Sequence, residues 1–197
     1  MGWIVAIIVV AIVVVAALAL LAARRRTRTN NLRDRFGPEY DRVADRADGR
    51  RDAEKELERR QDRREQLDIR PLAPAARERF ADRWEQTQTL FVEDPHAAIT
   101  QADRLVTEVM RERGYPVEDD FERRAGDISV DHPHLVDNYR GAHGIAHRSG
   151  TEGISTEDQR QAMVHFRGLF DELLGEGARE SSGARQQQAA EPRGSRF

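Results

Sequence analysis

Four of the six histidines fall close together along the chain, and their types and spacing favour metal chemistry. His143 and His147 are four positions apart, so on a helix both rings project from the same face. A His-x3-His pair of this kind can hold a zinc ion. His132 and His134 precede that pair by about two turns or more, roughly 13 Å along a helix axis, which is too far to share one ion.

This histidine set does not make a complete metal site by itself. Zinc normally takes at least three protein ligands, so a further ligand such as His96 or His165 has to come from a neighbouring helix. No glutamate follows His143, which excludes the His-Glu-x-x-His motif of zinc proteases. We therefore expect structural histidines and no cofactor. The alternatives are a metal site or enzyme built on these four residues, and a pH-responsive role.

The sequence lacks the usual motifs of other kinds of catalytic or metal site. The chain has no cysteine, which excludes disulfides and Cys-based zinc sites. The run Glu118-Asp119-Asp120 lacks the spacing of a calcium loop and is expected to open a helix. Ser129 and Ser155 are typical of turns and caps, and there is neither a nucleophile elbow nor a Gly-rich phosphate loop. The sequence therefore favours a protein without enzymatic activity.

Two segments expected to be loops carry polar and aromatic groups of the kind that binding sites use. They are Arg113-Gly-Tyr-Pro116 and Asp131-His-Pro-His134, and we expect them to face each other across a helical bundle. The residues of this predicted recognition surface are Arg113, Tyr115, Pro116, Asp131, His132, Tyr139 and Arg140.

An apolar run near the N-terminus predicts a membrane anchor. Residues 3–23 contain no charged side chain, and as a helix they span roughly 30 Å, about one hydrocarbon core. A lone strand would leave its backbone groups unsatisfied in lipid, so a helix is expected. The basic residues that follow at once are Arg24, Arg25, Arg26 and Arg28. The positive-inside rule then predicts a single-pass protein with its C-terminal domain in the cytoplasm.

The basic juxtamembrane segment, residues 24–35, is expected to contact anionic lipid headgroups through those arginines. The alternative is a cleaved signal peptide, since Ala17-Leu-Ala19 has the small-x-small form of a cleavage site. A secreted protein acting at the outer face would then result. Against export, the apolar run is long and no Lys or Arg precedes it.

A charged segment covers residues 36–70. It opens with Phe36-Gly-Pro38, where glycine and proline are expected to interrupt the preceding helix. From Glu39 to Asp68 the only glycine is Gly49 and proline is absent, which predicts one long stalk helix of roughly 45 Å. Its apolar positions are too sparse for a strong coiled coil, so a solvated spacer is expected. Its acidic and basic residues are segregated, so self-association through the stalk is an alternative.

The remaining chain predicts a small all-α bundle over residues 71–175 and a disordered tail over 176–197. Asp94, Pro95 and Gly114 are typical of an N-cap, a first-turn position and a C-terminal stop. The other expected helices cover about 74–92, 118–125, 131–148 and 156–174. The expected core residues are Phe80, Trp84, Leu105, Val109, Tyr139, Phe166 and Phe170.

The charge distribution limits the class of partner. Residues 24–35 carry six arginines and one aspartate, a net charge of +5, whereas residues 72–175 carry twelve basic and twenty acidic residues, a net charge of −8. An acidic domain lacks the cationic surface that nucleic acid requires, so nucleic-acid binding is not expected. The sequence favours a membrane-tethered, non-enzymatic helical module that binds a protein partner.

Several stretches resemble an uncharacterised family of small, single-pass membrane-anchored proteins of high-GC bacteria, often labelled "secreted". They are Phe91-Val-Glu-Asp-Pro95, Ala102-Asp103, Arg113-Gly-Tyr-Pro116, Ser129-Val-Asp-His-Pro133, Tyr139-Arg140 and Met163-Val-His-Phe-Arg167. The resemblance covers roughly residues 70–175 together with the order of anchor and charged helix. It implies location at a bacterial cell membrane and no assigned activity or catalytic residues.

Overall fold

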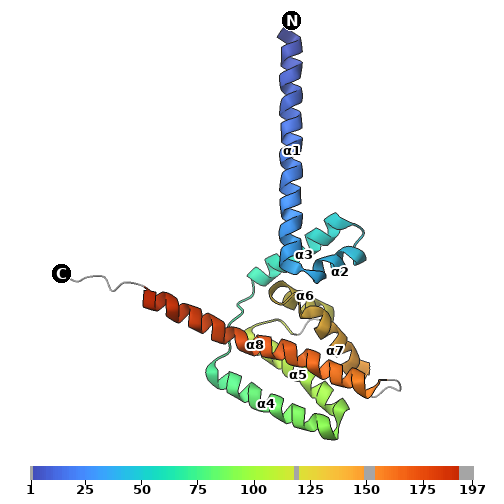
Figure 1. Ribbon diagram of the computed structural model, residues 1–197, viewed down its shortest axis with the longest axis vertical. Coiled ribbons are helices and arrows are strands. Elements are labelled where there is room, and N and C mark those ends of the chain that lie inside the picture. The colour runs from blue at the N-terminus through green and yellow to red at the C-terminus, as the bar shows by residue number, and fades with distance from the viewer. Residues whose placement is uncertain (1, 118–119, 149–153, 191–197) are drawn as a thin grey trace, which may run out of the picture. The chain divides into compact units, whose positions relative to one another are not determined.

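Helices form all the regular structure in the described part of the chain, which confirms the all-α prediction (Figure 1). The computed structural model describes the backbone of residues 2–117, 120–148 and 154–190. It also describes their side chains, except those of residues 2, 4–13, 21, 25 and 176–190. The chain divides into two compact units, Met1–Arg59 and Arg60–Phe197. The boundary lies inside helix α3 (Arg50–Glu65).

Helix α1 (Gly2–Phe36) contains both the apolar run and the basic segment. Within the portion of the chain that is described, no helix is long and apolar enough to cross a membrane. The side chains of residues 4–13 and 21, which belong to the predicted anchor, lie outside the described ones. The transmembrane helix therefore stays a prediction.

Glycines set the turns of the first unit. Gly37, with φ 49°, separates α1 from α2 (Pro38–Arg46), and Pro38 occupies the first turn of α2 as the sequence predicts. The prediction of a single long stalk helix is wrong, because α2 and α3 are separate helices. The chain leaves the helical conformation at Ala47, and Gly49 adopts φ 151°, which L-residues with a side chain rarely adopt.

The sparse apolar residues of this charged segment are buried rather than solvated. Tyr40 and Val43 of α2 are at most 7% exposed, and Ala53 and Leu57 of α3 are fully buried. Phe36, the last residue of α1, is also fully buried. Burial of these few side chains explains why a segment with so weak a hydrophobic pattern still folds compactly.

Two helices of the second unit have ends that follow from local sequence. They are α4 (Pro74–Glu93) and α5 (Pro95–Arg113). The Asp94 side chain accepts a hydrogen bond from the backbone N–H of Ala97, and Gly114 closes α5 in the left-handed conformation with φ 99°. These are the caps that the sequence predicts.

Helix α5 lies at the centre of the second unit, where it packs against α4, α7 (Val136–Arg148) and α8 (Thr156–Ala190) (Figure 1). Trp84 of α4 stacks on Phe170 of α8 with ring centroids 4.6 Å apart. The core prediction is confirmed at every position. The core includes Phe80, Trp84, Leu105, Val109, Tyr139, Phe166 and Phe170.

The prediction that a helix starts at Asp131 is wrong. Asp131 is the last residue of α6 (Phe121–Asp131), a helix that begins with Asp120 as its N-cap, and α7 starts only at Val136. His132 is non-helical, with φ −128° and ψ 56°, because the proline that follows it disfavours helical backbone. Residues 118 and 119 of the expected helix 118–125 lie outside the described residues.

Helix α8 starts at Thr156, as expected, but extends further than expected. Ser155 is the capping residue: its hydroxyl accepts from the backbone N–H of Asp158 at 3.0 Å, and its N–H donates to the Asp158 carboxylate at 3.1 Å. The helix ends at Ala190 rather than at Gly175. Gly175, Gly177 and Gly183 each cost a helix only about 1 kcal/mol, and helix-favouring Ala, Arg and Gln lie between and after them. Residues 191–197 of the predicted disordered tail lie outside the described residues.

Candidate functional site

A mixed histidine and carboxylate cluster lies where α5 meets α7. His143 and His147 project from the same face of α7, one turn apart, and their rings are 4.1 Å apart between centroids. Nδ1 of His143 lies 3.1 and 3.2 Å from the two carboxylate oxygens of Asp103 on α5. One ligand atom from each residue can be chosen so that all three atoms lie within 4.8 Å of one another.

The surroundings of the cluster hold one histidine ring in place. Phe121, the first residue of α6, stacks on His143 with centroids 3.6 Å apart and planes inclined by 4°. The side chain of His143 is 13% exposed and that of Asp103 is 16% exposed, whereas His147 is exposed. The cluster thus combines two partly buried, oriented groups with one ring that solvent reaches.

The other predicted histidine candidates lie elsewhere. His132 is buried at the end of α6, and His134 is exposed in the turn before α7. Among the described residues, the group with metal-ligand spacing contains neither of them. The sequence predicts a further ligand such as His96 or His165, whereas the residue that the structure places beside the pair is Asp103.

The prediction of an accessible recognition surface is wrong, because most of its residues are buried. Tyr115, His132 and Tyr139 are at most 3% exposed. Arg113 is 3% exposed and Arg140 8%. Such residues cannot form an accessible binding face. Loop composition alone did not reveal this, because burial of a loop depends on the helices packed over it.

The two predicted loop segments do meet, but the contact is structural. The Tyr115 hydroxyl donates to Asp131 Oδ2 at 2.7 Å, and Arg64 also pairs with Asp131. Arg113 donates from Nη1 to the backbone carbonyl of Leu173 at 3.2 Å, which ties the end of α5 to α8. Buried polar groups need such partners to offset their loss of hydration.

A second buried polar contact joins α6 to α7. Arg124 Nε donates to the Tyr139 hydroxyl oxygen at 3.1 Å. Burial raises the pKa of Tyr139 to about 12, although the nearby Arg124 charge acts in the opposite direction. Burial, together with the negative charge of Asp131, also raises the pKa of Tyr115. Both tyrosines therefore stay neutral in the folded protein well above the pH at which an exposed tyrosine ionises.

The first unit contains a cavity of about 590 Å³ with a strongly basic lining. Its basic side chains come from two helices: Arg26, Arg28 and Arg33 from α1, and Arg50, Arg51 and Lys55 from α3. Glu54 is the one acidic residue of the lining. Of the arginines predicted to contact the membrane, Arg26 and Arg28 therefore line this basic pocket, and the Arg25 side chain lies outside the described ones.

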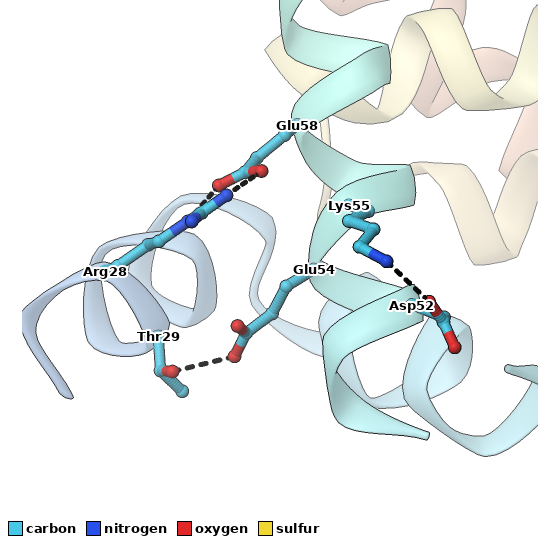
Figure 2. A network of polar contacts seen from close by, with 6 residues as sticks. All are labelled: Arg28, Thr29, Asp52, Glu54, Lys55 and Glu58. Carbon is cyan, nitrogen blue, oxygen red and sulfur yellow. Dashed lines mark hydrogen bonds and ion pairs between the residues drawn. The ribbon is translucent and has the colours of Figure 1, made fainter. Parts of the chain in front are cut away.

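A polar network connects α1 with α3 beside the basic pocket (Figure 2). Arg28 forms two hydrogen bonds with the carboxylate of Glu58, and the Thr29 hydroxyl donates to Glu54 at 2.7 Å. Glu54 also accepts from the Tyr40 hydroxyl at 3.1 Å. Two acidic residues of α3, Glu54 and Glu58, thus contact α1 of the same chain. Self-association through the stalk stays an untested alternative.

Comparison with known proteins adds no assignment: no protein-family model matches the chain, and no curated protein or solved structure matches it. The family resemblance inferred from sequence stays a prediction.

Proposed function

We propose that this protein is a membrane-tethered, non-enzymatic helical interaction module with its second unit on the cytoplasmic side. The uncharged residues 3–23 act as the anchor, and the arginines directly after them set the orientation. The first unit is the membrane-proximal element, and its basic pocket takes the phosphate of an anionic lipid headgroup. The second unit presents an acidic surface to a protein partner.

The observation that carries this proposal is the lining of the basic pocket. Six cationic side chains line one cavity, three from the basic segment directly after the apolar run and three from α3. Three of the six also pair with a carboxylate: Arg28 with Glu58, Arg33 with Asp41 and Lys55 with Asp52. Each basic residue near an anionic membrane surface contributes roughly 1 kcal/mol to binding. Because α3 folds back beside α1, arginines some 25 positions further along the chain join those of the juxtamembrane segment.

The second unit supports a binding rather than a catalytic role. Its residues 72–175 carry a net charge of −8, which favours a partner with a basic surface. Tethering to a membrane raises the effective concentration of such a domain near a membrane-bound partner without any additional contact.

Topology is the first testable consequence. An alkaline phosphatase fused after residue 70 is expected to be inactive, whereas a fluorescent protein fused at the same position is expected to fluoresce, because the segment stays in the cytoplasm. Replacing Arg24, Arg25, Arg26 and Arg28 by serine is expected to weaken or invert this result. An active phosphatase in the unmodified chain would favour the exported alternative and overturn the proposal.

Headgroup binding is the second testable consequence. The full chain in non-ionic detergent micelles is titrated with phosphatidylglycerol or phosphatidylcholine, and native mass spectrometry measures bound lipid. Arg51→Ser is expected to weaken phosphatidylglycerol binding about fivefold, since roughly 1 kcal/mol is lost. Arg59→Ser is the control, because Arg59 lies on the same helix and in the same unit but outside the pocket lining. Equal losses in both variants would argue against the basic pocket as the site.

A further inference from the structure

We propose that Asp103, His143 and His147 together bind one divalent transition-metal ion of the zinc class. This site is in the second unit and does not depend on the membrane-tethered function. Its ligands come from two helices, so a bound ion would cross-link α5 to α7.

The spacing of the ligand atoms suits a four-coordinate ion. Metal–ligand bonds of roughly 2.0–2.2 Å in a tetrahedral site place neighbouring ligand atoms a little over 3 Å apart. Nδ1 of His143 and the Asp103 carboxylate are already 3.1 Å apart. The set as a whole spans at most 4.8 Å, so only a small inward movement is needed. His147 can supply it, because its ring is exposed on the last turn of α7.

The chemistry of the ligand set selects the class of metal. Two imidazoles and one carboxylate suit zinc and its first-row neighbours, whereas calcium and magnesium prefer oxygen ligands throughout. Three protein ligands leave a coordination position for water, and the exposure of His147 gives the ion a path from solvent.

Part of the site is organised before the ion binds. Phe121 stacks flat on the His143 ring and fixes its plane, while the helix places His147 one turn further along. His143 and Asp103, which are already in contact, are therefore held close to their binding positions, and this lowers the conformational entropy lost on binding. The competing explanation is a direct polar contact between His143 and Asp103 alone, which involves neither His147 nor a metal.

The test uses the full chain purified in detergent without a histidine tag. After chelator treatment and buffer exchange, zinc chloride is added and the bound metal is measured by plasma mass spectrometry. Thermal unfolding is followed in a Trp3→Phe background, so that the fluorescence comes from Trp84, which is buried in the second unit. We expect about one zinc ion per chain and a higher melting temperature with zinc, because the ion binds only the folded state. Cobalt chloride should give the intense visible absorption of four-coordinate cobalt.

His147→Ala is the decisive variant, because an exposed ring contributes little to folding. This substitution removes a direct ligand of the ion. Loss of a residue that only supports a ligand weakens metal binding roughly 10–100-fold, so we expect a larger loss of zinc binding here. Asp103→Asn should weaken binding in the same direction. His96→Ala, which removes an exposed histidine elsewhere on α5, should leave zinc binding unchanged. Absence of zinc binding, or equal binding by the His147→Ala and His96→Ala variants, would overturn the proposal.

Discussion

Replacing Leu105 by alanine is expected to lower the free energy of unfolding of the second unit by about 2–5 kcal/mol. Leu105 is 1% exposed in the middle of α5, the helix that packs against α4, α7 and α8. Truncation removes buried methyl groups and leaves a cavity that the three surrounding helices can close only in part.

Urea unfolding monitored by tryptophan fluorescence measures this loss. Trp84, 2% exposed in the second unit, is the reporter, and a Trp3→Phe background removes the other tryptophan. Val92→Ala is the matched control, since Val92 is 84% exposed on α4 and its truncation should change stability by no more than about 0.5 kcal/mol. Similar losses in the two variants would contradict the described packing of α5.

Alkaline pH is expected to destabilise the second unit between about pH 10 and pH 12, chiefly through Tyr139. Burial raises the pKa of Tyr139 to about 12 in the folded protein, whereas an unfolded chain has a tyrosine pKa of about 10. The folded state therefore holds the proton more tightly. The resulting stabilisation is complete below pH 10 and is lost as the pH rises to 12. Its size is about 3 kcal/mol, and Tyr115 adds a loss of the same sign.

Urea unfolding at a series of pH values tests this dependence with the same Trp84 signal. Tyr139→Phe should flatten the decline of unfolding free energy between pH 10 and 12. It also removes the acceptor of the Arg124 hydrogen bond, so the slope against pH is the informative quantity, not the absolute stability. Val92→Ala, which removes no ionisable group and truncates an exposed side chain, should leave the slope unchanged. The same slope in Tyr139→Phe as in the parent chain would show that ionisation of Tyr139 does not oppose folding.

Helix ends determined by neighbouring residues were predictable from sequence. Asp94 and Gly114 bound α5 as expected, and the break at Gly37 with Pro38 in the first turn of α2 is where the sequence predicts it. Caps and prolines act within about one turn, so their effect does not depend on the rest of the fold. The core residues were predictable for a related reason, because a 3.6-residue apolar period marks the face that must be buried.

Helix ends determined by distant or weak influences were not predictable. Asp131 has the composition of an N-cap, yet its carboxylate accepts from Tyr115 and pairs with Arg64, some sixteen and sixty-seven positions away. The charged segment after Pro38 contains one glycine, and tertiary burial of Tyr40 and Leu57 favours a turn there over a continuous helix. Local propensity differs by only about 1 kcal/mol per residue, so packing decides such cases.

The candidate metal site was also predictable from the sequence only in part. The sequence alone determined that His143 and His147 share one face of a helix, because that spacing is a property of the helix itself. Only the tertiary structure decided that Asp103, forty positions earlier, faces them. The packing of α5 against α7 depends on the summed burial of many apolar side chains, and a carboxylate at the edge of that interface carries no local signal of its partner.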